Sequence, residues 1–265
     1  MKQRVFIVMI CIVAGMVLLS CRNENRQTEE LPQLRIGGAI YEPYYYKAID
    51  GDYTGIDVEL AREACKRLGY EPVFVEMDLD KRNVYLEDGT IDCMWNCLPM
   101  EDTAEECQWA GPYLYSRRVI VVPKDSTIKE LADLGGKTLA VQASSTAETI
   151  FLDNIGKSIP DVDRLETFQT IGEVFTALRK GYVDAIAGHE GALLVYTKDY
   201  PEEYRYLNLS IHLSKLGVAF AKSADSQLVE ELTIVLQEMT EDGTTAEILE
   251  RYGLDVKRNI YGGED

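Results

Sequence analysis

Short apolar runs alternate with helical patterns from residue 34 onward. Apolar and small residues predominate at 34–40, 72–76 and 91–97, which predicts three strands. Between the first two, residues 57–69 place their apolar side chains on one face of a helix, and the glycine at the end predicts its stop. This alternation is typical of βαβ units and of mostly parallel sheets.

The same alternation continues through the second half of the chain. The strands and helices predicted there lie at 137–142, 144–155, 162–168, 170–181, 183–188, 226–239 and 244–253. Two of the helices begin with capping-box pairs, Ser145 with Glu148 and Thr170 with Glu173. In such a pair each residue satisfies a backbone N–H group that the helix start leaves without a partner.

An internal similarity suggests two halves of like construction. Residues 86–96 (LEDGTIDCMWN) and 178–188 (LRKGYVDAIAG) share a leucine, a glycine, a β-branched residue and an aspartate at the same spacing. One interpretation is coincidence, because such joints between a helix and a strand are common. The other is a pair of lobes, each built on its own α/β unit.

Two lobes predict an α/β fold in which the apolar runs 116–124 and 216–223 cross between them as a double-stranded hinge. The predicted divisions are lobe 1 at 34–122, lobe 2 at 123–216, helices that return to lobe 1 at 217–255, and a tail at 256–265.

The N-terminal residues have the pattern of an export signal. Lys2 and Arg4 precede the uncharged run Val5–Leu19. This run is shorter than the roughly 20 residues of a membrane-spanning helix, and it fits the apolar part of a secretory signal.

A cysteine follows the apolar run. Ser20 and Cys21 resemble the bacterial lipobox, in which the signal is cut before a cysteine that then carries a lipid. We therefore expect a lipoprotein signal peptide at 1–20, lipidation of Cys21 and a polar, flexible tether at 21–33. The alternative is an uncleaved anchor helix with an incidental cysteine.

The charge balance excludes one class of partner. The chain has 45 acidic and 27 basic residues and a formal net charge of −18. A nucleic-acid-binding protein needs a clustered basic face, so nucleic acid is not an expected partner. The histidines are His189 and His212, and neither HExxH nor CxxC occurs, so we expect no metal ion and no other cofactor.

Polar and aromatic residues follow four of the predicted strands. In open α/β sheets, ligands bind beyond the carboxyl ends of the strands. The segments there are Ala39–Lys47, Asn96–Met100, Ala143–Thr146 and Gly188–Gly191. The third begins a helix, whose free N–H groups suit an anion. Four strand ends that face one cleft would form a ligand site between the lobes.

The candidate contact residues lie in these segments. They are Tyr41, Tyr44, Asn96, Cys97, Leu98, Pro99, Ser145, Thr146, His189 and Glu190. The tyrosine rings would attract a cation, with ordinary packing as their alternative. His189 could instead be a hydrogen-bonded structural histidine, and we expect Trp95 and Trp109 in the core.

These segments, in this order, resemble the bacterial type 2 solute-binding proteins of ABC importers, in the amino-acid-binding family 3 branch. The resemblance covers about residues 34–253 and lies in EPYYY, GDYTGIDVELAREACKRLG, DGTIDCMWN, QWAGPYLYSRRVIVV, LGGKTLAVQASSTAE, GYVDAIAGHEG and LGVAFAK. It implies a periplasmic-binding-protein-like type II fold whose two lobes close on a solute and then dock on a membrane permease.

Two positions depart from the amino-acid-binding relatives. In those proteins an arginine after the third strand of lobe 1 clamps the α-carboxylate, and an aspartate at the end of a lobe 2 strand holds the α-ammonium. Here Ala104 and His189 stand in those places. The sequence therefore does not name the solute.

Several ways of holding a solute stay open. The helix N-terminus at Ser145 and Thr146 could hold a carboxylate unaided, or Arg117 or Arg118 could reach in from the hinge rather than lie on the surface. Alternatively, the solute is not an ordinary α-amino acid. An acidic loop would favour a neutral or cationic solute unless it is only a solvated rim; its residues are Glu101, Asp102, Glu105 and Glu106.

Four cysteines follow the signal and the lipidation site. Cys65 lies on the apolar face of its helix and is expected as a buried thiol. A disulfide between Cys97 and Cys107 is a hypothesis, because disulfides form outside the cytoplasm.

We interpret the chain as an extracytoplasmic, lipid-anchored solute-binding protein of an ABC importer. Its solute would be small and polar, with amino acids and related amines favoured. The expected partners are the solute, the permease subunits and, through the lipid, the membrane; the protein is expected to be a monomer.

One alternative is an enzyme on the same fold, as the cyclohexadienyl dehydratases are, with His189 or Glu190 as its acid or base. Another is a sensor module that reports to a separate protein.

Overall fold

The computed structural model describes residues 31–101, 106–207 and 212–262. The chain divides into two units, Met1–Pro32 and Gln33–Asp265, and the second is described here by itself. The predicted signal peptide, Cys21 and Ala104 lie outside the described residues, and so do Asp102 and Glu105.

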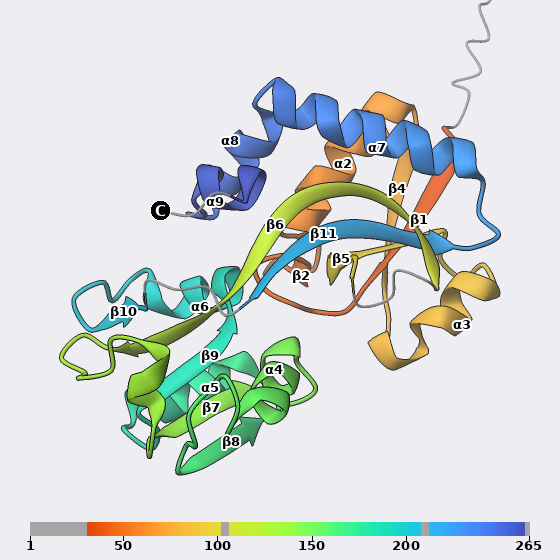
Figure 1. The fold of residues 1–265 in the computed structure, drawn as a ribbon. Helices are drawn as coiled ribbons and strands as arrows, with labels where there is room; N and C mark the ends of the chain where they lie inside the picture. The colour runs from red at the N-terminus through yellow and green to blue at the C-terminus, as the bar shows by residue number, and fades with distance from the viewer. Residues whose placement is uncertain (1–30, 102–105, 208–211, 263–265) are drawn as a thin grey trace, which may run out of the picture. The chain divides into compact units, whose positions relative to one another are not determined.

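The unit contains alternating strands and helices, largely where the hydrophobic pattern predicts them (Figure 1). In chain order they are β1 (Gln33–Gly38), β2 (Tyr46–Lys47), β3 (Tyr53–Thr54), α2 (Ile56–Leu68), β4 (Glu71–Glu76), the 3₁₀ turn η1 (Leu79–Lys81), α3 (Arg82–Glu87), β5 (Cys93–Pro99), β6 (Cys107–Pro123), η2 (Leu131–Leu134), β7 (Thr138–Gln142), α4 (Thr146–Asn154), β8 (Arg164–Phe168), α5 (Ile171–Arg179), β9 (Ala185–His189), α6 (Glu190–Thr197), β10 (Tyr204–Tyr206), β11 (His212–Ala221), α7 (Ser226–Glu241), α8 (Thr244–Arg251) and α9 (Val256–Tyr261).

Two parallel groups of strands are joined through an antiparallel pair. The order in the large sheet is β4-β1-β5-β11-β6-β9-β7-β8, with β10 beside β6. Strand β1 runs parallel to β4 and β5, and β7 runs parallel to β8 and β9. Between these groups, β6 and β11 lie side by side and antiparallel (Figure 1). They contain most of the two apolar runs that the sequence predicts as crossing strands.

The apolar side chains gather in separate cores on the two groups of strands. The first core contains Trp95 and gathers apolar side chains of α2, α7 and α8 with those of β1, β5 and β6. Residues 256–265, expected only as a tail, include helix α9, whose Ile260 is buried in this core.

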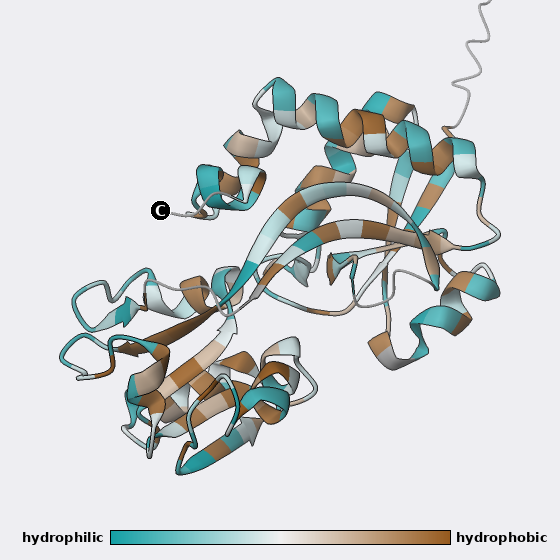
Figure 2. Cartoon of the chain, in the orientation of Figure 1, coloured by the Kyte–Doolittle hydropathy of each residue, from teal (hydrophilic) through white to brown (hydrophobic). Residues whose placement is uncertain are grey.

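The C-terminal half of β6 is buried on both faces. Val119 and Val121 of β6 pack with α5 and α6, whereas Ile120 and Val122 pack with Phe151 of α4. Successive side chains of a strand point to opposite faces, so this run needs an apolar residue at every position. Figure 2 shows the resulting hydrophobic stretch of β6.

The internal similarity corresponds to one structural device used twice. After a glycine in the left-handed region, Asp92 accepts the backbone N–H of Arg35 in β1 at 2.7 Å. Asp184 accepts the N–H of Thr138 in β7 at 2.8 Å. Each aspartate therefore ties the loop before one strand to the start of the neighbouring parallel strand.

We expect Asp92→Ala to lower the free energy of unfolding by about 1–3 kcal/mol. The change removes an acceptor for Arg35 N–H and a side-chain pair with the Arg35 guanidinium, whose Nη2 lies 2.5 Å from Asp92 Oδ1. Urea unfolding would measure the loss. Asp163→Ala, at an exposed position, is the control, and an equal effect of both changes would contradict the proposed role.

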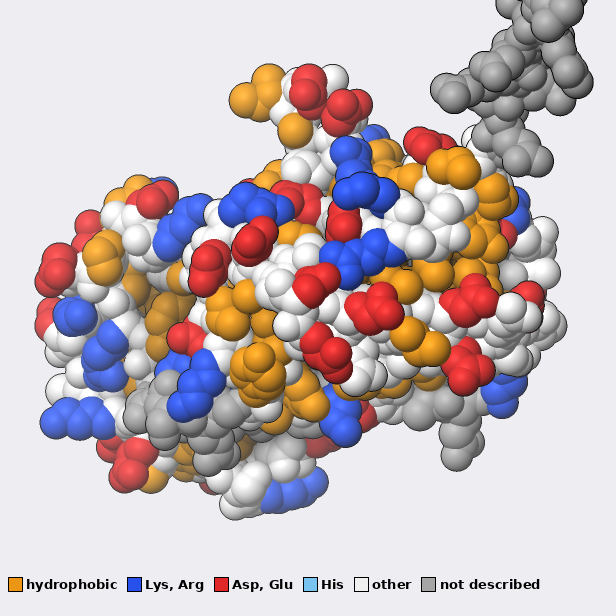
Figure 3. Space-filling view, turned by 90° about the horizontal axis from the view of Figure 1, so that it is seen from above, with side chains coloured by type: hydrophobic (Ala, Val, Ile, Leu, Met, Phe, Trp, Pro, Cys, Tyr) orange, Lys and Arg blue, Asp and Glu red, His pale blue; other side chains and the backbone are white. Residues whose placement is uncertain are grey.

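The surface carries mixed charges where the outer helices meet. Arg67 of α2 pairs with Asp242 beside α7 at 2.7 Å, and Arg251 of α8 pairs with Glu59 of α2. On the face shown in Figure 3, acidic and basic side chains are interspersed. Among the described residues, no helix is both long enough and apolar enough to cross a membrane.

Candidate functional site

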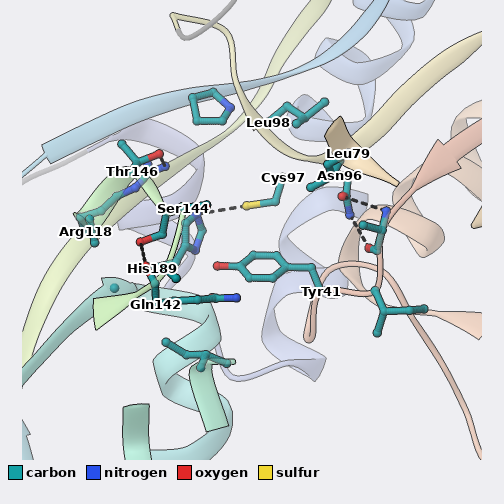
Figure 4. Close-up of a pocket in the computed structure, with 18 residues that line it drawn as sticks. Tyr41, Leu79, Asn96, Cys97, Leu98, Arg118, Gln142, Ser144, Thr146 and His189 are labelled. Atoms are coloured by element: carbon teal, nitrogen blue, oxygen red, sulfur yellow. Dashed lines mark hydrogen bonds between the residues drawn. The ribbon is translucent and has the colours of Figure 1, made fainter. Parts of the chain in front are cut away.

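A cavity of about 280 Å³ lies where four strand ends meet. Its walls come from the residues after β1, the end of β5, the turn from β7 into α4, and the end of β9 (Figure 4). These are the carboxyl ends of the parallel strands, where α/β sheets bind ligands.

Most of the predicted contact residues line this cavity, and their role in binding stays a prediction. They are Tyr41, Asn96, Cys97, Leu98, Pro99, Ser145, Thr146 and His189. Further lining residues include Gln142, Leu79 and Ile171, none of which the sequence singled out.

Tyr44 and Glu190, also predicted as contacts, do not line the cavity. Tyr44 is 1% exposed and lies behind Tyr41, with its hydroxyl 3.4 Å from His189 Nδ1. A Cβ at Gly191 would lie 2.4 Å from that hydroxyl, so only glycine permits this approach. Glu190 instead pairs with Arg258 of α9 at 3.1 Å. Both side chains therefore lie next to the cavity walls, and their contact with a solute stays a prediction.

Arg118 is the main residue that the sequence left undecided. A surface position was one interpretation, and it is wrong: Arg118 is 5% exposed and lines the cavity. The cause is long-range pairing, because β6 lies between β11 and β9 and is an inner strand. Its guanidinium donates to Ser214 Oγ at 2.7 Å and to Thr146 Oγ1 at 3.1 Å.

The start of α4 faces the same cavity. Ser145 caps the helix and accepts the N–H of Glu148 at 3.2 Å. The Glu148 carboxylate accepts the N–H of Ser144 at 2.6 Å, so the predicted capping box is shifted by one residue on this side. Thr146 and Ala147 begin the helix, and their N–H groups have no partner within it.

Cys97 and His189 meet across the cavity floor. The Cys97 Sγ lies 3.1 Å from His189 Nε2, and Figure 4 shows the hydroxyl of Tyr41 pointing toward the same ring. Ser116 Oγ also contacts that nitrogen. Cys97 carries a free thiol, so the hypothesis of a disulfide to Cys107 is wrong. Its sulfur faces His189.

The backbone of Cys97 is held by a buried carboxylate. The Asp57 side chain accepts a hydrogen bond from the Cys97 N–H at 2.6 Å and another from the Tyr113 hydroxyl at 2.9 Å. Asp57 is 1% exposed, and burial raises its pKa to about 7 despite these two hydrogen bonds.

Burial keeps the pair on the cavity floor uncharged. It raises the pKa of the Cys97 thiol well above the ordinary range. It lowers the pKa of His189, and the positive charge of Arg118 lowers it further. A neutral ring with its proton on Nδ1 can donate to Tyr44 Oη and accept the Cys97 S–H on Nε2.

The acidic loop does not set the charge of the described cavity walls. Glu101 accepts a hydrogen bond from the Lys215 N–H at 3.1 Å, and Glu106 accepts one from Asn83 Nδ2 at 3.4 Å. Neither lines the cavity. Among the described lining residues, Arg118 is a cation and none is a carboxylate, and no group of three metal-ligating side chains occurs in the described part of the chain.

Comparisons with known proteins agree with this architecture. The family model described as "Bacterial extracellular solute-binding proteins, family 3" matches residues 34–255. The probable amino-acid-binding protein YxeM of Bacillus subtilis is 27% identical over 258 residues, which cover 95% of this chain and 96% of YxeM.

Two solved structures have similar folds. An ancestral arginine-binding protein bound to arginine is 29% identical, with a TM-score of 0.66 over 84% of this chain and 98% of that one. The ancestral amino-acid-binding protein AncCDT-1, a precursor of cyclohexadienyl dehydratase, is 26% identical, with a TM-score of 0.69 over 83% and 94%. The predicted fold class is thereby confirmed.

Proposed function

Because the chain belongs to family 3 of the bacterial extracellular solute-binding proteins, we propose that it captures a small carboxylate solute of the amino-acid class. The cavity at the strand ends is the binding site, and an ABC permease receives the solute. The observation that carries the proposal is the buried guanidinium of Arg118 in the cavity wall.

A buried guanidinium needs a counter-charge. Arginine does not deprotonate in proteins, and a buried charge without an opposite charge is costly. The hydrogen-bond acceptors of Arg118 are the hydroxyls of Ser214 and Thr146, which carry no charge. A solute carboxylate would supply the missing charge through charge-assisted hydrogen bonds.

The start of α4 supports the same orientation of the solute. Thr146 both accepts from Arg118 and begins the helix, so the guanidinium and the helix N-terminus face one place. N–H groups and the helix dipole there favour a negative charge. The carboxylate of the solute would therefore lie between Arg118 and the first turn of α4, whereas its other end points toward Tyr41 and Leu98.

The remaining parts of the proposal concern location and mode of action. The pattern around Cys21 supports a lipid anchor on the outer side of the cell membrane, with residues 21–33 as tether. Strands β6 and β11 would act as the hinge between lobe 1, at 34–122 and 217–255, and lobe 2, at 123–216. The relatives are mostly binding proteins, which supports capture of the solute without chemical change. The protein would act as a monomer.

Matched ligand pairs test this function. We expect L-arginine, L-histidine or another amino acid to raise the melting temperature and to give saturable calorimetric binding. The decarboxylated partners, agmatine and histamine, are expected to bind at least about tenfold more weakly, because they cannot engage Arg118. An amine that binds as tightly as its acid would contradict the proposal, and NMR of the released solute would reveal any turnover.

A further inference from the structure

The thiol of Cys97 is placed as a nucleophile would be. It lines the cavity, and its Sγ lies 3.1 Å from Nε2 of His189, within reach for a proton transfer between the two. A base beside a thiol, itself oriented by a third group, is the arrangement that activates nucleophiles in enzymes. Solute capture alone requires no such pair.

Two hydroxyl groups that could orient the histidine ring lie beside it. Tyr44 Oη lies 3.4 Å from Nδ1, and Ser116 Oγ also contacts the ring. Both side chains are 1% exposed, so the ring has little freedom to turn. His189 can therefore present Nε2 to the sulfur in one orientation.

The backbone around the thiol is strained. Cys97 has φ 52 and Ser144 has φ 57, and they are the non-glycine residues with positive φ in the described part of the chain. Both line the cavity. Such left-handed conformations are strained for residues other than glycine, and they gather at functional sites. Here Asp57 holds the strained conformation through the Cys97 N–H.

We propose that Cys97 forms a mixed disulfide with a small disulfide that carries a carboxylate. The proposal rests on the proposed function, because Arg118 would hold that carboxylate and so bring the S–S bond toward the cavity floor. The protein would then capture one half of the disulfide covalently.

The step is a thiol–disulfide exchange. Cys97 Sγ attacks one sulfur of R–S–S–R and loses its proton to His189 Nε2; a Cys97–S–S–R bond forms as the old S–S bond breaks. The leaving thiolate takes the proton back from Nε2 and departs as R–SH. One disulfide replaces another, so no oxidant or reductant is consumed.

The uncharged resting pair determines when the proton moves. Burial favours a neutral thiol and a neutral imidazole, so little thiolate exists before the disulfide arrives. His189 is therefore needed as an acceptor during the attack, and its contribution can be measured separately from that of the sulfur. Small disulfides persist in the oxidising space outside the cytoplasm, where this family works.

The test compares two small disulfides that differ in charge. The full-length chain with Cys107→Ser, which removes a half-buried thiol outside the cavity, is incubated with 3,3′-dithiodipropionic acid or with the cationic cystamine. Peptide mass spectrometry then follows the adduct with time. We expect modification of the peptide that contains Cys97, at least about tenfold faster with the acid than with cystamine, and no modification of this peptide when Cys97→Ser is added.

Two variants separate the roles of base and anion site. His189→Gln is expected to slow the reaction by at least about hundredfold, and Arg118→Gln to remove the preference for the acid. No adduct on the folded protein, when urea-unfolded protein reacts, would overturn the proposal, as would an unchanged rate in His189→Gln. If Cys97→Ser still binds a carboxylate solute in calorimetry while wild type forms no adduct, this inference fails and the proposed function stands.

Discussion

Arg118→Gln is expected to weaken the binding of a carboxylate solute by about a hundredfold or more. A charge-assisted hydrogen bond contributes about 1.5–3 kcal/mol, and a hundredfold change in Kd corresponds to about 2.7 kcal/mol. Glutamine can keep one hydrogen bond to Ser214 or Thr146, but it has neither the positive charge nor the planar set of N–H donors of the guanidinium.

The same change should not destabilise the protein without solute. Removing a buried charge whose acceptors are two hydroxyls relieves a desolvation cost. We therefore expect the free energy of unfolding of the unliganded variant to stay equal or to rise. A purely structural role of Arg118 predicts the opposite, a loss of stability, so affinity and stability together distinguish the two roles.

Two further variants sharpen the measurement. Arg118→Lys keeps the charge but loses the planar fork, and its affinity is expected to lie between those of wild type and Arg118→Gln. Arg179→Gln removes an exposed charge at the end of α5 and controls for net charge. Calorimetric titration with the best amino acid from the ligand panel gives all four affinities. If Arg118→Gln binds the solute with the affinity of the wild type, Arg118 is not part of the binding site.

The parts of the fold that local pattern determines could be predicted from the sequence. The repeated aspartates illustrate this, since Asp92 and Asp184 follow a glycine stop and precede an apolar strand in both halves. The strand ends were also predictable, because alternation of strands and helices fixes which ends share an edge.

The residues that the sequence left open depend on long-range pairing. Arg118 is buried because β11, almost a hundred residues further on, covers one side of β6. Glu190 does not line the cavity and instead pairs with Arg258 of α9. Because residues 256–265 were expected only as a tail, no partner for Glu190 was expected there. Tyr44 and Tyr41 have the same chemistry and are three residues apart, and the rings of both pack edge-on against His189. Only the tertiary packing, which buries Tyr44, decides that Tyr41 lines the cavity.

Stability should depend on pH through two buried groups with opposite signs. The pKa of Asp57 is raised to about 7 from an ordinary value of 3.8, mainly by burial. Between about pH 4 and 7 the folded protein keeps this proton and the unfolded chain has lost it. The Asp57 contribution therefore falls as pH rises through this range, by about 4 kcal/mol at 1.36 kcal/mol per pKa unit, and is constant above it.

The contribution of His189 to stability depends on pH with the opposite sign. Its pKa is lowered by burial and by Arg118, so the folded protein holds the ring neutral at pH values where the unfolded chain binds a proton. The unfolded state takes up this proton below its ordinary pKa of about 6.5. The His189 contribution to stability therefore rises as pH rises toward 6.5, and it is lost on acidification.

Variants should separate the two slopes. In Asp57→Asn the falling contribution disappears, so the free energy of unfolding, relative to wild type, should increase steadily from about pH 4 to about pH 7. In His189→Gln the rising contribution disappears, so the same difference should decrease toward pH 6.5. Urea unfolding across this range measures both, and subtracting the wild-type profile cancels the other titrating groups. A constant Asp57→Asn difference across the range would mean that Asp57 titrates alike in the folded and unfolded chains, and that Cys97 is held by an ordinary ionised carboxylate.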